Sequence, residues 1–259
     1  MPFDFDGDKY RQASEHQKEW GNRLISELVL TGSERILDLG CGDGVLTWQL
    51  AELVPRGYVL GLDGSPGMLE TAKQQTCANL SFVCMDINDM DFSNEFDLIF
   101  SNAALHWVKN HEALLRNCKK ALRENGMIRW SFGGAGNCFN LDETLGAAAR
   151  APEYKDFFEG FQWPWYMPGV EEYTKLVESA GYSNIEIALE NADRYFANSD
   201  ELIKWIDQPC IVPFLDYLSM PETKAMFRDV VIREMLAKTL CSDGTHFEIF
   251  RRINVMAAK

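Results

Sequence analysis

Short apolar runs alternate with amphipathic stretches through the first half of the chain. The apolar runs predict β-strands at 35–39, 58–63, 80–85, 96–101 and 127–132. Between them, apolar residues recur at helical spacing, which predicts helices at 11–30, 45–54, 65–75 and 111–123. This alternation favours a parallel sheet that is covered by helices on both faces.

The regular alternation ends after Phe132. Segment 133–168 is rich in glycine, alanine and aromatic residues and shows no clear period. Beyond it, the pattern predicts a helix at 170–180, a strand at 185–189, a helix from Ser199, and helical stretches near 212–218 and 223–240. The closing sequence HFEIFRRINVMAAK alternates like one half-buried strand. In such a strand, we expect Arg251 and Arg252 to face solvent on either side.

A glycine-rich turn joins the first strand to the next helix in the sequence LDLGCGDG. Gly40, Gly42 and Gly44 permit positive φ and allow a ligand to approach the backbone. A dinucleotide site prefers G-x-G-x-x-G and places an anionic pyrophosphate at the helix start. Here the spacing is G-x-G-x-G, and Asp38 and Asp43 disfavour an anion, so a ligand with a cationic amino-acid end fits better. The competing interpretation is a tight turn that binds nothing.

Two further acids follow the next strands. Asp63 ends the second predicted strand, where a carboxylate can accept hydrogen bonds from both ribose hydroxyls. Asp86 follows the third, and beside Ile87 it can bond an adenine amino group, although an exposed turn residue is the alternative. Asp38, Asp63 and Asp86 would then share the edge at which open α/β sheets bind ligands.

Composition excludes several classes of function. A net charge of −14 over 259 residues makes a nucleic-acid partner unfavourable, and no apolar run is long enough for a membrane span. The acidic start MPFDFDGDKY predicts no secretory signal. The seven cysteines form no C-x-x-C pair, so we expect reduced thiols in a cytoplasmic protein. His106 and His111 are not spaced as metal ligands on one helical face, so no metal site is predicted.

Four motifs in order carry a resemblance to a known family. They are LDLGCGDG, LGLDGSPGMLETAK, CMDIND and FDLIFSNAALHWVKNHEALLRNCKKALRENG. Together they resemble class I S-adenosylmethionine-dependent methyltransferases. NAALHWV followed by HEALL is similar to trans-aconitate and juvenile-hormone-acid methyltransferases, and ELIKWIDQPCIVPFLDYL and FRRINVMAAK extend the former resemblance across nearly the whole chain.

The resemblance implies an α/β fold: a Rossmann-like seven-stranded sheet with its last strand antiparallel, plus a helical substrate cap. It implies a single catalytic domain, in which residues 1–132 form the N-terminal helix and the cofactor-binding core. Residues 133–259 would supply the cap and the final helix and strands of the same sheet. The implied cofactor is S-adenosyl-L-methionine. Its implied contacts are Tyr10, Asp38, Gly40, Gly42, Asp63, Gly64, Met68, Asp86, Ile87, Asn102 and Ala103.

The implied reaction needs no catalytic triad. A carboxylate acceptor is already ionised at neutral pH, so an enclosed site that aligns the reactants is sufficient. Gln17, His106, Trp107 and Arg194 are the candidates for orienting the carboxylate. His106 has a structural role as its alternative. The aromatic residues that could exclude water are Trp107, Trp130, Phe139, Phe161, Trp163, Trp165 and Tyr166.

The expected partner is a small-molecule acid, and the expected assembly is a monomer or homodimer. The resembled family usually has Thr where Pro209 stands and Arg where Val212 stands. With little positive charge expected nearby, these departures favour an acid with fewer charges and more apolar bulk than aconitate.

Other functions remain open on the sequence alone. Within enzymes, the acceptor could instead be an acyl-carrier-bound carboxylate or an amine. A dinucleotide-binding oxidoreductase is disfavoured by the loop spacing and the lack of a Tyr-x-x-x-Lys pair. A non-catalytic binding protein is disfavoured by Asp63, Asp86 and Asn102.

Overall fold

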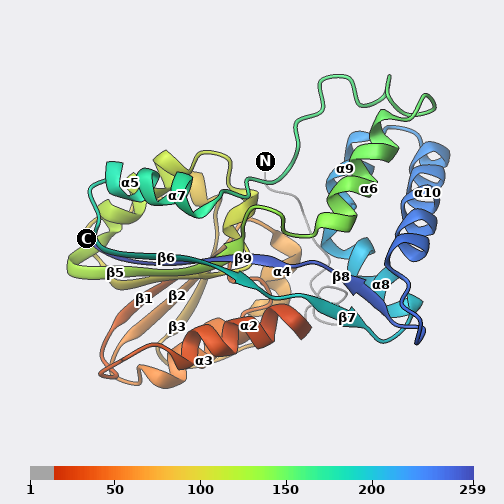
Figure 1. Cartoon of the computed structure of the whole chain (residues 1–259). Helices are drawn as coiled ribbons and strands as arrows, with labels where there is room; N and C mark the ends of the chain where they lie inside the picture. Colours follow the sequence, from red (N-terminus) through yellow and green to blue (C-terminus); the bar gives the residue numbers. More distant parts are fainter. Residues whose placement is uncertain (1–14) are drawn as a thin grey trace. The chain divides into compact units, whose positions relative to one another are not determined.

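The computed structural model describes residues 15–259 and contains one large, mostly parallel sheet (Figure 1). The sheet has seven strands in the order β3-β2-β1-β4-β5-β9-β6. Their bounds are β1 Arg35–Leu39, β2 Tyr58–Asp63, β3 Leu80–Cys84, β4 Phe96–Asn102, β5 Leu122–Gly133, β6 Ser183–Asn191 and β9 Arg251–Ala258. Strands β3, β2, β1, β4 and β5 pair in parallel, and β9 runs antiparallel to β5. The predicted fold class is confirmed.

Helices cover both faces of this sheet, as the alternating pattern predicted (Figure 1). On one face, Leu24 and Ile25 of α2 and Leu50 of α3 pack against Ile36 and Val59. On the other face, side chains of α5 and α7 pack in a second apolar cluster. The bounds of these elements are α2 Glu15–Ser26, α3 Val45–Leu53, α4 Pro66–Ala72, η1 Ile87–Asp89, η2 Leu105–Trp107, α5 His111–Ala121 and α7 Val170–Ser179. Ser65 caps α4 by accepting a bond from the Met68 N–H, and Pro66 opens the helix.

The chain forms two compact units. Of the described residues, the first comprises 15–135, 165–190 and 252–259, and the second comprises 136–164 and 191–251. The second unit consists of α6 Phe139–Arg150, β7 Arg194–Phe196, α8 Ser199–Trp205, η3 Ile206–Cys210, α9 Val212–Tyr217, α10 Pro221–Thr239 and β8 His246–Glu248. Residues after 132 thus contribute to both units.

Three elements differ from their sequence predictions. β5 begins at Leu122 rather than near residue 127, with Asn125 in a left-handed conformation inside it. The closing segment is two strands: β8 pairs with β7, and β9 joins the large sheet. The chain turns where the Phe250 N–H donates to Asp193, and an alternating pattern carries no sign of such a break.

Helix α6 has no counterpart among the predicted elements, and its N-terminus explains why. Its N-cap, Cys138, is left-handed with φ 52° and provides no side-chain cap. The cap comes from the buried carboxylate of Glu248, which accepts bonds from the Asn140 and Leu141 N–H groups at 3.0 and 3.2 Å. A cap that lies more than a hundred residues away in sequence leaves no local signal.

Within the described residues, no helix has the length and apolar character to cross a membrane. The seven cysteines are free thiols. Over the same residues, the structure contains no cluster of three or more potential metal-ligating His, Cys, Asp or Glu side chains.

Candidate active site

The glycine turn after β1 is held tightly against β2. The N–H groups of Gly40 and Cys41 both donate to the Leu62 carbonyl, at 2.8 and 3.0 Å. Gly40, Gly42 and Gly44 have φ values of 72°, 55° and 76°, a region that favours glycine. The positive φ is therefore by itself a sufficient reason for glycine at these three positions.

Two of these glycines are also required by packing within the protein. A Cβ on Gly40 would lie 2.2 Å from the Cβ of Ala104, in the loop that follows β4. A Cβ on Gly44 would lie 2.8 Å from the ring of Phe82 on β3. The positive φ expected at these glycines is confirmed, Gly40 and Gly44 are required by packing as well, and the approach of a ligand to the turn stays a prediction.

Asp38 lies buried beneath the turn. One of its carboxylate oxygens accepts a 2.7 Å hydrogen bond from the Thr47 hydroxyl on α3. Burial raises the pKa of Asp38 to about 7, the Thr47 bond opposes this rise, and the charge of Asp63 adds to it. The site thus holds a buried carboxyl group that a nearby cation would stabilise in its ionised form.

Asp63 ends β2 and connects the turn to the start of α4. Its two carboxylate oxygens accept bonds from the Gly42 and Ser65 N–H groups, each at 2.9 Å. Burial raises the pKa of this group above its usual value. A carboxylate has lone pairs beyond those that these two bonds use, so Asp63 can still accept bonds from a diol.

Asp86 occupies a turn after β3 and is half-buried. Its Oδ1 accepts from the Asn88 N–H at 2.9 Å and from the Asn88 side-chain amide at 2.8 Å, which caps η1. Ile87 beside it packs against the main apolar cluster. Asp86 therefore has a structural role in the turn, and a role toward adenine would be additional to it.

The end of β4 brings distant parts of the chain together. The Asn102 side-chain amide donates to the Gln17 carbonyl on α2 at 2.8 Å. Ala103 has a positive φ of 58°, unusual for a residue with a Cβ, and its N–H donates to the Ser131 carbonyl at 2.8 Å. Strained backbone of this kind persists where surrounding contacts hold it, commonly at functional sites.

Arg252 also lies at this position, contrary to the sequence expectation that it faces solvent. Its side chain is buried, with 3% of its surface exposed. The guanidinium donates to Asn102 Oδ1 at 2.8 Å, to the Ser131 carbonyl at 2.7 Å and to the Ser131 hydroxyl at 3.0 Å. Its central carbon lies 4.4 Å from the ring centre of Trp20 on α2, a cation–π contact. The error arose because β9 is an interior strand, and both of its faces are covered.

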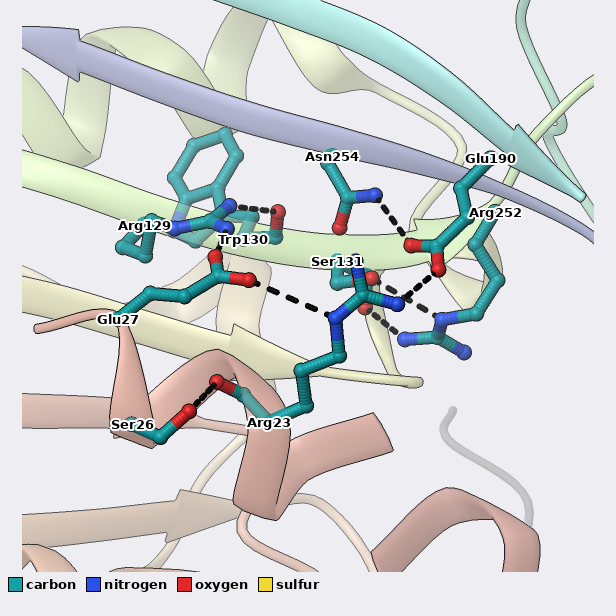
Figure 2. A network of polar contacts seen from close by, with 9 residues as sticks. All are labelled: Arg23, Ser26, Glu27, Arg129, Trp130, Ser131, Glu190, Arg252 and Asn254. Atoms are coloured by element: carbon teal, nitrogen blue, oxygen red, sulfur yellow. Dashed lines mark hydrogen bonds and ion pairs between the residues drawn. The ribbon is translucent and has the colours of Figure 1, made fainter. Parts of the chain in front are cut away.

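A network of charges anchors α2 to the sheet (Figure 2). Arg23 pairs with Glu27, which directly follows α2, and with Glu190 on β6, and Glu27 pairs with Arg129 on β5. Glu190 also accepts a 3.0 Å bond from Asn254 on β9. The network positions the helix that carries Gln17 and Trp20.

The loop after β4 presents His106 and Trp107 on η2. His106 Nδ1 is buried and has no hydrogen-bond partner among the described residues, and the same is true of Gln17 Oε1. Burial lowers the pKa of His106 to about 3, assisted by the charges of Arg252 and His111. His106 is therefore neutral near pH 7, a hydrogen-bonding group rather than a base.

His111, by contrast, is a structural histidine. It is buried, and its ring nitrogens lie 2.8 Å from the Tyr173 hydroxyl and 3.0 Å from the Leu105 carbonyl. Both ring nitrogens of His111 thus have hydrogen-bond partners, as the structural alternative proposed for His106 would require. His106 Nδ1 has none among the described residues.

The aromatic residues expected to exclude water fall into separate groups. Trp107 and Trp165 pack edge to face, with ring centres 5.8 Å apart. Trp130 is fully buried in the main apolar cluster, so its expected place in the site wall is wrong. Tyr166 packs on His111 at 4.7 Å.

The remaining aromatic candidates belong to the second unit. Phe161 and Trp163 pack on Phe214 there, at 4.9 and 5.0 Å, and Phe139 at the start of α6 is 44% exposed.

Comparison with known proteins agrees with this geometry. A family model described as a methyltransferase domain matches residues 36–126. An uncharacterised methyltransferase of Schizosaccharomyces pombe is 28% identical over 100% of both chains. The trans-aconitate 2-methyltransferase of Deinococcus radiodurans is 30% identical, with 86% of each chain covered. The chain belongs to the class I S-adenosylmethionine-dependent methyltransferases.

Solved structures share the fold at low sequence identity. The phosphoethanolamine N-methyltransferase 2 of Haemonchus contortus, solved with S-adenosyl-L-methionine, gives a TM-score of 0.61 at 18% identity, over 98% of this chain and 56% of that one. The YcgJ protein of Bacillus subtilis gives 0.63 at 16% identity, over 93% of this chain and 98% of that one.

S-adenosylmethionine is the cofactor of this methyltransferase, and the residues at the edge of β1 to β3 fit it. Asp63 can accept from a ribose diol, and the buried Asp38 favours a nearby ammonium group. Membership of this family excludes the oxidoreductase alternative.

The structure brings together most of the predicted site residues. Asp38, Gly40, Gly42, Asp63 and Gly64 cluster around the ends of β1 and β2, and Met68 is buried on α4. Arg194 lies on β7 in the second unit. Tyr10 lies outside the described residues.

Sequence reasoning missed that Ser131 and Arg252 lie beside Asn102. The available signal was the position of β9 as the last strand of an α/β sheet. A strand with neighbours on both sides buries residues on both faces. One of two adjacent arginines in such a strand is therefore expected to be buried and hydrogen-bonded inside the protein.

Proposed function

We propose that this methyltransferase transfers its methyl group to an ionised carboxylate of a small acid, and so forms a methyl ester. When bound, S-adenosylmethionine supplies an electrophilic methyl, which a carboxylate oxygen attacks with its lone pair while the S–CH₃ electron pair stays on the neutral thioether. No proton moves in this step. The protein's own groups therefore need only bind the acid and orient its carboxylate toward the methyl group.

The observation that carries the proposal is the buried Nδ1 of His106, which has no hydrogen-bond partner among the described residues and lies in surroundings that keep the ring neutral. A histidine whose pKa is lowered to about 3 is a poor base near neutral pH. An amine or hydroxyl acceptor must lose a proton to react, whereas a carboxylate is ionised already. The neutral imidazole can instead donate a hydrogen bond from Nδ1 that orients the acid. The buried Gln17 Oε1 is an acceptor, so Gln17 can donate to the acid only through its amide N–H groups.

The relatives support the same chemistry. Besides the trans-aconitate 2-methyltransferase of Deinococcus radiodurans, one from Rhodococcus jostii is 28% identical over 98% of both chains. These enzymes are named for methylating a carboxylic acid. We propose that Gln17, His106 and Trp107 orient the acceptor, and that Asp38, Asp63, Asp86 and Asn102 are the cofactor-side groups.

The test is a methyl-transfer assay with labelled cofactor over a panel of small acids and amines, including an acyl-carrier-bound acid. Products are then treated with mild alkali, which hydrolyses esters and leaves N-methyl groups intact. We expect label in acid products that is released as methanol. Label that is confined to amines and survives alkali would disprove the proposal.

A further inference from the structure

Helix α10 of the second unit has an inner and an outer face (Figure 1). Phe227, Val231 and Met235 are fully buried and recur at every fourth position, so they form the inner face. Helical geometry places another set of side chains on the opposite side. We call this set the α10 face, and its members are Ala225, Met226, Asp229, Arg233, Leu236 and Ala237.

The α10 face is open to solvent. Met226 is 59% exposed, and the side chains of Asp229 and Arg233 are 76% and 70% exposed. A groove runs along the C-terminal half of this face, and its apolar lining residues are Ile203, Ile232, Leu236, Ala237 and Leu240. Apolar surface of this kind gains free energy when a partner removes it from water.

The sequence of the α10 face is symmetric about the level of Val231. Counted outward from Val231 in both directions, the face has a charged residue two positions away, a large apolar residue five away and an alanine six away. The two charged residues have opposite signs. The symmetric pairs are Asp229 with Arg233, Met226 with Leu236, and Ala225 with Ala237.

A face with this symmetry fits an antiparallel second copy of itself. In a two-fold contact, a residue that meets a different residue of the partner is met in turn by that residue's copy. With the two-fold axis at the level of Val231, Asp229 of each copy lies at the height of Arg233 of the other, so two ion pairs form. Large side chains then lie beside small ones: Met226 beside the partner's Ala237, and Leu236 beside the partner's Ala225.

The charges also select this arrangement over other ways of pairing the same helix. An axis at the level of Arg233 would oppose two arginines, and an axis at the level of Asp229 would oppose two aspartates. A parallel pair in register would do both. Like charges that face each other across a contact are costly, so the antiparallel arrangement about Val231 is favoured.

The contacts that the two charged residues make within the chain leave them available to a partner. Asp229 lies 3.6 Å from Arg228, and Arg233 lies 3.0 Å from Glu234. Exposed pairs of this kind contribute little to stability. Arg228 is held elsewhere, because it donates hydrogen bonds of 2.7 and 2.6 Å to Asp207. A second copy would remove water from around Asp229 and Arg233 and so strengthen their attraction.

We propose that this protein forms a two-fold homodimer through the α10 face, with the two helices antiparallel and Asp229 of each copy paired with Arg233 of the other. The proposal concerns assembly and does not depend on which acceptor is methylated. One helix from each copy gives a small interface, about 1,000 Å² in total, so we expect a dissociation constant in the micromolar range.

The first experiment measures the mass of the wild-type protein by sedimentation velocity, at concentrations on either side of the expected dissociation constant. We expect monomer at the lowest concentration and dimer at the highest. A protein that stays monomeric at concentrations about a hundredfold above the micromolar range would overturn the proposal.

The second experiment reverses one charge at a time. Asp229→Arg and Arg233→Asp each place like charges at both ion pairs, so each should weaken self-association by at least about tenfold. An equimolar mixture of the two variants restores both ion pairs and should form a heterodimer with nearly wild-type affinity. Arg116→Asp is the control with the same change of charge, at an exposed position of α5, and should dimerise like the wild type.

Two results with these variants would overturn the proposal. If both variants kept the wild-type dimer, the interface would lie on another surface. If both lost it and their mixture formed no heterodimer, the two charges would act within one helix and not across the contact. Binding of S-adenosylhomocysteine by each variant, measured by calorimetry, shows that the first unit is folded, and heterodimer formation shows that α10 is intact in both.

Discussion

The two halves of the sheet edge that carry the site are assembled in different ways. At the ends of β1 to β3, the partners are close in sequence: Asp38 binds Thr47 nine residues away, and Asp63 binds Gly42 across 21. At the ends of β4, β5 and β9, Asn102 binds Gln17 across 85 residues and Arg252 across 150. The first half is a local motif, and the second exists only once the whole unit has folded.

The difference separates two tasks. A cofactor that a large family shares can be bound by one short sequence motif. Groups that bind the acceptor can instead come from separate elements, and each of these can change in sequence independently. We therefore expect substitutions in the first half to affect folding or cofactor affinity, and those at Gln17, His106 and Trp107 in the second half to affect acceptor use. Asn102, a proposed cofactor-side group that binds the Gln17 backbone, lies where the two halves meet.

The largest expected effect tests whether Gly40 serves packing. Gly40→Ala should lower the free energy of unfolding by about 3 kcal/mol, because it adds left-handed strain and a clash with Ala104. Gly244→Ala is the matched control, since Gly244 has φ 88° with open space around it and should lose about 1 kcal/mol. Denaturant unfolding measures both. Equal losses would show that Ala104 yields and that packing does not require this glycine.

The next effect tests the cofactor half. Asp63→Ala should weaken binding of S-adenosylhomocysteine by about 1.5–3 kcal/mol, because it removes a charged acceptor and releases the Gly42 N–H. Calorimetry measures this, and KM for the acceptor at saturating cofactor should not change. Asp91→Ala, at an exposed pair with Lys120, is the control and should bind normally. A folded Asp63→Ala protein with unchanged affinity would remove Asp63 from this role.

A smaller effect tests the acceptor half. Gln17→Met keeps the length of the side chain and removes its amide, so kcat/KM for the acid should fall about tenfold through loss of one hydrogen bond to a charged group. Affinity for S-adenosylhomocysteine should stay within about twofold. Asn22→Ala, at an exposed position on the same helix, should change neither value. If Gln17→Met weakened cofactor binding instead, the boundary between the two halves would be misplaced.

The same distinction explains what the sequence could predict. The strands β1 and β2 match their predicted bounds, because short apolar runs bounded by turn residues are a local signal. Asp38 and Asp63 were found for the same reason. Helix α6, the break between β8 and β9, and buried Arg252 were missed, because each depends on a partner more than fifty residues away. The alternation of apolar and polar residues along β9 does not indicate which of its residues will contact Ser131 on β5.

The smallest expected effect is a pH dependence that should be confined to the cofactor half. Burial raises the pKa of Asp38 to about 7 in the free protein, so the carboxyl is mostly protonated at pH 6 and mostly ionised at pH 7.5. A bound ammonium group favours the ionised form, and binding below pH 7 must therefore release a proton. The affinity for S-adenosylhomocysteine should accordingly fall, by about eightfold, as the pH drops from 7.5 to 6.

Calorimetry in two buffers of different ionisation enthalpy measures both the affinity and the proton released. Asp38→Asn cannot ionise, so its affinity should be lower at pH 7.5 and should stay level down to pH 6, with no proton released from this site. His106 remains neutral over this range because its pKa lies near 3, so it adds no second step. If the wild-type affinity stayed constant from pH 7.5 to 6, Asp38 would not be the group that meets the cofactor's cationic end, and the local half of the site would serve only to shape the turn.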